Sequence, residues 1–146
     1  MKGKILFCST SDVFEQNLDE YQVKLQITRY TKKGILSGFI HALGLSPNED
    51  LLNTTNNKWK KLIFTDVEKQ KMAKGKTGTW WDLYCEQFYL QMEMDITFIL
   101  NYQRLKEHLD NGNNIIACCY CKEPDKCHRS LIANSLKNEG YNVTLI

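Results

Sequence analysis

The chain has 146 residues, of which 42% are hydrophobic and 25% charged, proportions that predict one globular domain with a single core. Its 19 basic and 17 acidic residues give a net charge of +2, which argues against a protein that binds nucleic acid mainly by charge. No apolar run approaches the roughly 18 residues that a membrane span needs, and no signal peptide is visible. The six cysteines include close neighbours that pair poorly, so we expect reduced thiols and a cytoplasmic location.

The N-terminal part of the chain predicts two strands. Residues 4–8 form an apolar run that ends in Ser9 and Thr10, polar residues typical of the carboxyl end of a buried strand. Residues 22–30 alternate apolar and polar side chains, as a half-buried strand does, and end at Arg29. Both strands therefore present polar side chains where they stop.

The predicted helices differ in how strongly the sequence marks them. Ser46 and the following Pro47 indicate a helix start, whereas the residues at 51–58 are rich in Asn and Thr and predict a loop. Gly112 follows a periodic apolar segment at the place where a helix C-terminal cap favours glycine. We expect helices over residues 13–21, 66–74, 80–92, 95–109 and 127–138.

Near the C-terminus, a strand over residues 113–119, a polar loop, the helix over 127–138 and a strand over 141–146 follow one another. Strands that alternate with helices predict an α/β fold, here a single domain over residues 1–146 with a mainly parallel sheet flanked by helices. Ligands of such sheets bind beyond the carboxyl ends of the strands. We therefore expect Ser9, Thr10, Arg29 and the loop after residue 119 at one end of the sheet.

That loop concentrates the reactive side chains of the sequence. Cys119, Cys121, Cys127, His128 and Arg129 lie between the predicted strand and helix. The unpaired backbone N–H groups and the dipole at a helix N-terminus favour an anion, and the same field lowers the pKa of a thiol. Cysteine phosphatases and sulfur-transfer enzymes have five residues between Cys and Arg, a spacing that this loop does not offer, so we reject their mechanism.

The C-terminal motif resembles the family named domain of unknown function 488. It consists of a strand ending in Cys119, seven residues, and then Cys127-His128-Arg129, followed by Ser-Leu-Ile-Ala and Leu. Weaker similarities precede it in the same order along the chain: the Arg-bearing segment at 27–30, the Pro-containing segment at 43–52, Lys74-Gly75, Tyr84 and Tyr89.

The resemblance implies an α/β fold but no assigned activity. The functional positions of the family fall, residue by residue, on the following residues of this sequence: Arg29, Tyr84, Tyr89, Cys119, Cys127, His128 and Arg129. The chain departs from the family at Cys121, where many relatives carry glutamate, so this position has no carboxylate here.

Four interpretations of the loop stay open. Its residues could bind an anion, could use Cys127 or His128 in catalysis, or could be structural, with Arg129 paired to a carboxylate across the sheet. Cys119, Cys121, Cys127 and His128 are also potential ligands of zinc, although the single residue between the first two is shorter than the usual ligand spacing. We expect no metal and no cofactor, with zinc as the weaker alternative.

The ligand that these features favour is a small phosphate-bearing molecule, such as a nucleotide or a nucleotide-derived signal. Either Trp81 or Tyr84 would stack on its base. The expected ligand-binding residues are Ser9, Thr10, Arg29, Tyr84, Cys119, Arg129 and Ser130.

Three alternatives stay open. The first is a non-catalytic protein that sequesters a nucleotide immune signal, as small virus-encoded counter-defence proteins do. The second is an enzyme that uses Cys127 or His128 on a nucleotide, and the third is a nucleic-acid accessory protein. The composition is compatible with a viral origin. We expect neither a membrane nor, in the main interpretation, a nucleic acid as partner, and the sequence does not indicate the oligomeric state.

Overall fold

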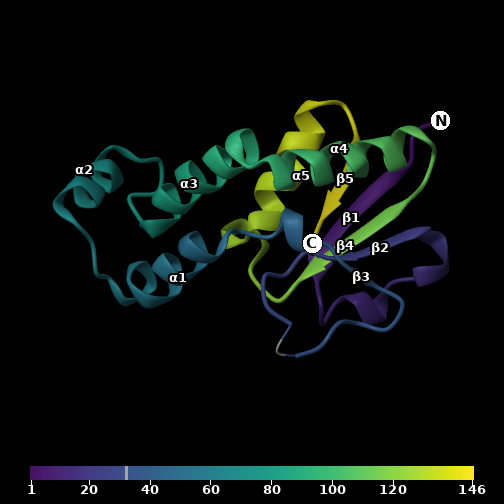
Figure 1. Cartoon of the computed structure of the whole chain (residues 1–146), viewed down its shortest axis with the longest axis horizontal. Helices are drawn as coiled ribbons and strands as arrows, with labels where there is room; N and C mark the ends of the chain where they lie inside the picture. Colours follow the sequence, from purple (N-terminus) through teal and green to yellow (C-terminus); the bar gives the residue numbers. More distant parts are fainter. Residues whose placement is uncertain (32) are drawn as a thin grey trace. The chain divides into compact units, whose positions relative to one another are not determined.

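A computed structural model describes residues 1–31 and 33–146, which group into two compact units (Figure 1). The first unit combines residues 1–46 with residues 96–146, and the second comprises residues 47–95. That the whole chain forms one domain stays a prediction. In the part of the chain that is described, no helix is both long and apolar enough to cross a membrane.

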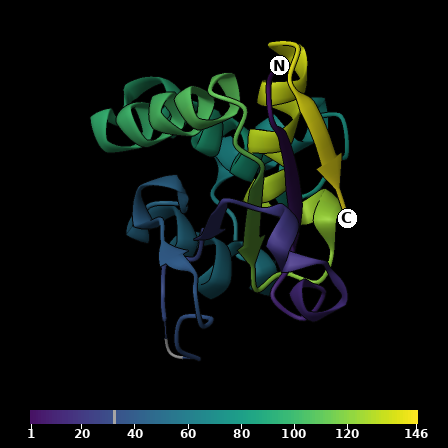
Figure 2. The same cartoon turned by 90° about the vertical axis from the view of Figure 1, so that its right-hand side faces the viewer.

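The first unit contains a five-stranded sheet in which every neighbouring pair is parallel (Figure 2). The strand order is β3-β2-β4-β1-β5. The predicted α/β fold with a parallel sheet is thus confirmed. The strands are β1 (Lys4–Ser9), β2 (Val23–Gln26), β3 (Ile40–His41), β4 (Ile115–Cys119) and β5 (Asn142–Leu145).

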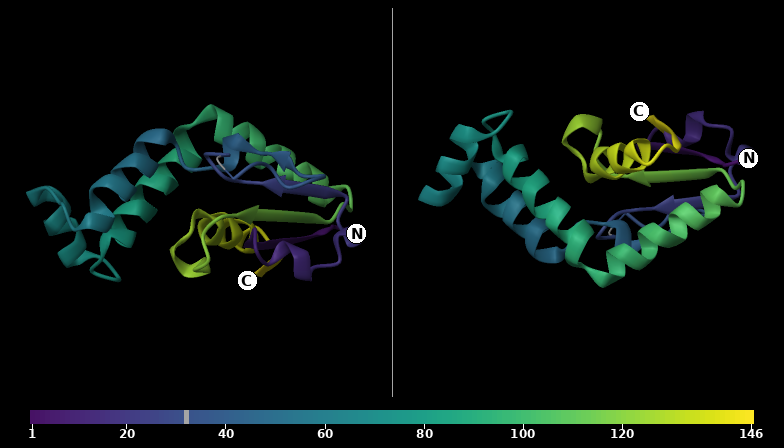
Figure 3. Two further views of the ribbon diagram at one scale, coloured as in Figure 1. Left: turned by 90° about the horizontal axis from the view of Figure 1, so that it is seen from below. Right: turned by 90° about the horizontal axis from the view of Figure 1, so that it is seen from above.

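Two long helices belong to this unit, α4 (Ile96–Asp110) and α5 (His128–Asn138). The connections that contain them, from β3 to β4 and from β4 to β5, advance in the same direction along the sheet. Because such crossovers are right-handed, both helices lie on the same face. Figure 3 shows α4 on the side of β2 and β3, and α5 beside β1 and β4.

The opposite face is covered by irregular chain. Leu6, Cys8, Ile116 and Cys118 point to this face and form a buried cluster with residues of the segments that follow β1 and β2. Since side chains alternate along a strand, the next residue, Cys119, points to the face that carries α5. The two adjacent cysteines of β4 therefore have different surroundings.

The second unit is helical, with α1 (Glu49–Asn57), α2 (Asp66–Lys74) and α3 (Trp80–Met94). The helix predicted over residues 66–74 has the observed bounds, and that over 80–92 continues to Met94. Thr65 caps α2 and forms a reciprocal capping box with Glu68.

Two local predictions are wrong, and one short strand was missed. The segment 13–21 forms two single 3₁₀ turns, Val13–Glu15 and Leu18–Glu20, in place of one α-helix. The segment 51–58 lies mostly in α1, because Asn48 caps the helix by accepting a hydrogen bond from the Leu51 N–H, and Leu51 and Thr55 are buried one turn apart. The two-residue strand β3 was not predicted.

We predict that Glu68→Ala lowers the free energy of unfolding by about 1–2 kcal/mol at pH 7, because Glu68 accepts hydrogen bonds from the Thr65 N–H and the Trp59 indole. Burial alone would raise the pKa of Glu68, but these hydrogen bonds lower it. The contribution is therefore complete above the ordinary carboxyl range and is lost as the pH falls through the folded-state pKa. Urea unfolding at several pH values measures the difference, with the exposed Glu93→Ala as the control.

Candidate functional site

The carboxyl ends of β1 and β4 lie side by side, with Ser9 opposite Cys119 in the register. From β1 the chain crosses toward β2 on one face, whereas from β4 it crosses through α5 toward β5 on the other. Connections that leave neighbouring strands in opposite directions create a crevice at their carboxyl ends, where parallel sheets bind their ligands. The predicted loop is therefore at the position in the fold where a ligand is expected.

Three of the six cysteines meet at this end of the sheet. Cys119 Sγ and Cys127 Sγ are 2.9 Å apart, and both side chains are 1% exposed. Cys121 is exposed and its thiol also hydrogen-bonds to that of Cys127. The structure thus joins two buried thiols and one exposed thiol in a single cluster.

Arg129 is completely buried beneath the loop, and its guanidinium holds three segments together. Nη1 donates to Cys119 Sγ at 3.1 Å and to the Cys121 carbonyl at 2.6 Å, while Nη2 donates to the main-chain oxygen of Ile146 at 3.2 Å. Its Nε–H is buried with no acceptor among the described residues. The guanidinium therefore has the capacity to donate one more hydrogen bond.

The alternative in which Arg129 pairs with a carboxylate is not supported. Within the described residues, no aspartate or glutamate side chain forms an ion pair with it. Its acceptors are instead the Cys119 sulfur and the main-chain oxygens of Cys121 and Ile146. The guanidinium is thus held by one sulfur and by the backbone.

His128 is held by the neighbouring strand segment. Its Nε2 lies 2.7 Å from the Ile27 carbonyl oxygen, and a carbonyl can only accept, so Nε2 carries the proton. Burial lowers the pKa of His128 to about 4, which keeps the ring neutral. Nδ1 then presents its lone pair toward Cys127 Sγ, 3.6 Å away.

The thiols differ in their preference for the charged form. The hydrogen bond from Cys127 lowers the pKa of Cys119, and the Arg129 guanidinium lowers it further against the effect of burial. The same hydrogen bond raises the pKa of Cys127 to about 12. The arrangement favours the thiolate form of Cys119 over that of Cys127. A catalytic role of Cys127 or His128 stays a prediction.

Ser9 and Thr10 lie beside this cluster, as predicted, but their polar groups are already paired. The buried Ser9 hydroxyl donates to the Asp12 carboxylate at 2.8 Å and lies 2.9 Å from the Ser11 hydroxyl. The Thr10 N–H donates to the Cys119 carbonyl at 2.9 Å. Asp12, a half-buried carboxylate that follows β1, was missed by the sequence reasoning; its place three residues after Ser9 was the available signal.

Arg29 and Ser130 also belong to this end of the first unit. Arg29 is half-buried and follows, two residues on, the Ile27 carbonyl that binds His128. Among the described residues it has no ion pair, so its charge is available. The Ser130 hydroxyl instead donates to the Cys127 carbonyl at 2.8 Å in the first turn of α5.

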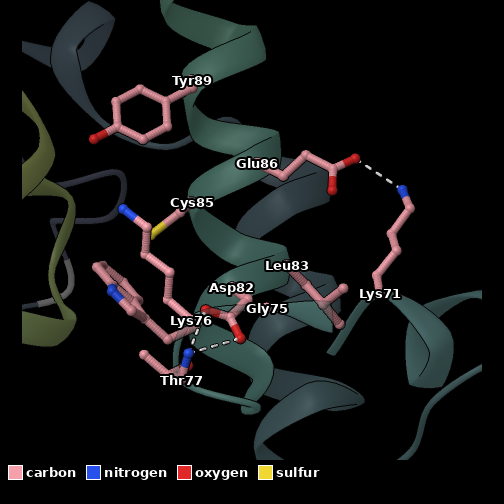
Figure 4. Close-up of a pocket in the computed structure, with 10 residues that line it drawn as sticks. Lys71, Gly75, Lys76, Thr77, Asp82, Leu83, Cys85, Glu86 and Tyr89 are labelled. Carbon is pink, nitrogen blue, oxygen red and sulfur yellow. Dashed lines mark hydrogen bonds and ion pairs between the residues drawn. The ribbon is translucent and has the colours of Figure 1, made fainter. Parts of the chain in front are cut away.

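Tyr84 lies in the other unit, within a stack of aromatic rings on α3. Its ring centroid is 5.0 Å from that of Trp81 and 6.0 Å from that of Phe88, and the side chain is buried. Trp81 and Tyr89 line a pocket of about 400 Å³ within this unit. Figure 4 shows Lys76 extending along α3 past Cys85, while Lys71 pairs with Glu86. Base stacking by Trp81 or Tyr84 stays a prediction.

The clustered sulfur and nitrogen atoms also form a potential metal site. The ligand atoms of Cys119, Cys127 and His128 lie within 4.8 Å of one another, and all three residues are buried. Thiolates and a neutral imidazole are the donors that zinc prefers.

Comparison with known proteins places the chain in a family. The family model described as the active DUF488-N3 subclade matches residues 40–140, well over half of the chain. This range includes the cysteine loop and the start of α5. No curated protein and no solved structure matches the chain significantly. The extent of the match shows that the chain belongs to the active DUF488-N3 subclade of the DUF488 family.

Proposed function

We propose that the chain binds a small phosphate-bearing molecule of the nucleotide class at the carboxyl ends of β1, β2 and β4. The observation that carries the proposal is the reversal of strand connections between β1 and β4, beside which α5 begins; parallel sheets bind their ligands at such a point. A helix N-terminus with unpaired N–H groups favours an anionic group there. We infer that this binding takes place in the cytoplasm, where thiols stay reduced.

Two side chains of opposite charge lie on either side of this point in the sheet, Arg29 after β2 and Asp12 after β1. Arg29 follows β2 and would bind the phosphate, because its planar guanidinium can donate two parallel hydrogen bonds to phosphate oxygens. Asp12 follows β1 and would accept hydrogen bonds from sugar hydroxyls. Since β4 lies between these strands, the two positions are separated by about two strand spacings, roughly 10 Å. A phosphorylated sugar with an attached base has this extent.

Arg129 has a supporting role in this proposal. Its burial and its contacts with Cys121 and Ile146 favour a side chain that fixes the loop, on which the ligand then rests.

An enzyme acting on the same ligand is the second candidate, and the description of the family as active favours it. A non-catalytic protein releases its ligand unchanged. Mass spectrometry of the nucleotide after prolonged incubation therefore distinguishes the two candidates.

We predict that Arg29→Ala weakens nucleotide binding at least about tenfold, the loss expected when a phosphate no longer has a cation that binds it. Isothermal titration calorimetry with mononucleotides, dinucleotides and the corresponding nucleosides measures this loss. Nucleosides should bind weakly to both proteins, and Arg104→Ala, which removes an exposed arginine from α4, should leave the affinity unchanged. Equal affinities of wild type and Arg29→Ala for every nucleotide that binds would contradict the phosphate site.

A further inference from the structure

We propose that Cys119, Cys121, Cys127 and His128 form a zinc site that fastens the loop after β4 to the start of α5. The inference is independent of the proposed nucleotide binding. Three of these residues bring their ligand atoms within 4.8 Å of one another in a buried setting, and the fourth, Cys121, hydrogen-bonds to the Cys127 thiol. Structural zinc sites are built from this donor set, three cysteines and one histidine.

The orientation of His128 supports a ligand role. Histidines that bind metal with one ring nitrogen generally donate the other N–H to a carbonyl or carboxylate, which fixes the tautomer and the ring plane. Here Nε2–H is held by the Ile27 carbonyl at 2.7 Å, and Nδ1 points into the sulfur cluster at 3.6 Å from Cys127 Sγ. The ring is thus held in the tautomer and orientation that a zinc ligand requires.

The charges around the cluster also match. Three thiolates and one zinc ion leave a single negative charge, which the buried Arg129 guanidinium neutralises. No aspartate or glutamate in the described part of the chain pairs with Arg129, and its Nη1 already donates to Cys119 Sγ. Its Nε–H, which has no acceptor among the described residues, offers a further hydrogen bond to a ligand sulfur.

The sulfur positions require only a small adjustment. Two thiolates on one tetrahedral zinc ion lie about 3.8 Å apart, given zinc–sulfur bonds of about 2.3 Å. Cys119 Sγ and Cys127 Sγ are 2.9 Å apart. Side-chain rotations that move the sulfur atoms apart by about 1 Å would therefore make room for the ion. The ligands would be deprotonated on binding, and each bound zinc ion would release the protons of the thiols that it coordinates.

Metal analysis of the purified full chain tests the proposal. The protein is produced in zinc-supplemented medium, and zinc per chain is measured by native mass spectrometry and elemental analysis. The zinc-stripped protein is then titrated with Co²⁺, which reports tetrahedral thiolate coordination by a near-ultraviolet charge-transfer band and visible bands. We expect one zinc ion per chain and both signatures with wild type.

Matched variants identify the ligands. Cys119→Ala should lower zinc affinity more than about tenfold, whereas Cys118→Ala, at the adjacent and equally buried position on the opposite face of β4, should keep it. Because Cys119→Ala could unfold, the exposed Cys121→Ala provides a second test and should weaken the charge-transfer band. Wild type that takes up less than about a tenth of an equivalent of zinc overturns the proposal. An unchanged Co²⁺ spectrum in Cys121→Ala or in a folded Cys119→Ala overturns this ligand set.

Discussion

Replacing Arg129 with leucine is expected to lower the free energy of unfolding by about 3–5 kcal/mol, the cost of breaking a buried charge interaction by removing one partner. The guanidinium is completely buried and donates to two main-chain oxygens, of Cys121 and Ile146, and to the Cys119 sulfur. Leucine fills part of the volume but donates to none of these acceptors. The loop after β4 and the end of β5 would lose their shared anchor.

The lysine variant separates the charge from the geometry. Arg129→Lys keeps a positive charge but cannot direct several hydrogen bonds from a planar group, so it should recover less than half of the lost stability. Urea unfolding followed by circular dichroism measures both variants in samples of equal metal content. Arg104→Ala is the control for loss of an exposed arginine and should change stability by no more than about 0.5 kcal/mol. A loss below about 1 kcal/mol in Arg129→Leu would show that the guanidinium is dispensable.

The C-terminal βαβ unit could be predicted closely because each of its boundaries has a local chemical cause. Gly112 adopts a φ of 87° after α4, and its N–H donates to the Leu109 carbonyl, as expected of a glycine at a helix C-terminus. The long apolar run and the periodic helix on either side of the loop left little ambiguity about the elements. Strand alternation also explains why Cys119, and not Cys118, faces α5.

The shorter elements could not be predicted, because they have too few residues for a period to emerge. The 3₁₀ turns after β1 and the two-residue strand β3 form where tertiary contacts place them. The cluster around Arg129 could be predicted only in part. Its thiols were visible in the sequence, but its other acceptors are main-chain oxygens, which any residue supplies and no motif marks. One of the open interpretations therefore paired Arg129 with a carboxylate, where the structure uses backbone and sulfur.

Gln26 is a second buried polar residue whose role emerges only from the fold. Its side chain is completely buried, and its amide N–H₂ lies within hydrogen-bond distance of Thr28 Oγ1, the Gly34 carbonyl and the Tyr120 hydroxyl. Its amide oxygen accepts from the Leu36 N–H at 3.0 Å. The side chain thus ties β2 both to the segment before β3 and to the first residue of the cysteine loop.

We predict that Gln26→Leu costs about 2–4 kcal/mol, because leucine preserves the approximate volume while leaving several polar partners without their hydrogen bonds. Tyr120→Phe should cost about 1 kcal/mol, and the double variant should lose less than the sum, since both changes remove the same contact. Unfolding of the single and double variants gives this coupling directly, with the exposed Gln103→Leu as the control. Fully additive losses would mean that Gln26 stabilises β2 without reaching the loop, and the cysteine cluster would then depend on Arg129 and His128 for its position.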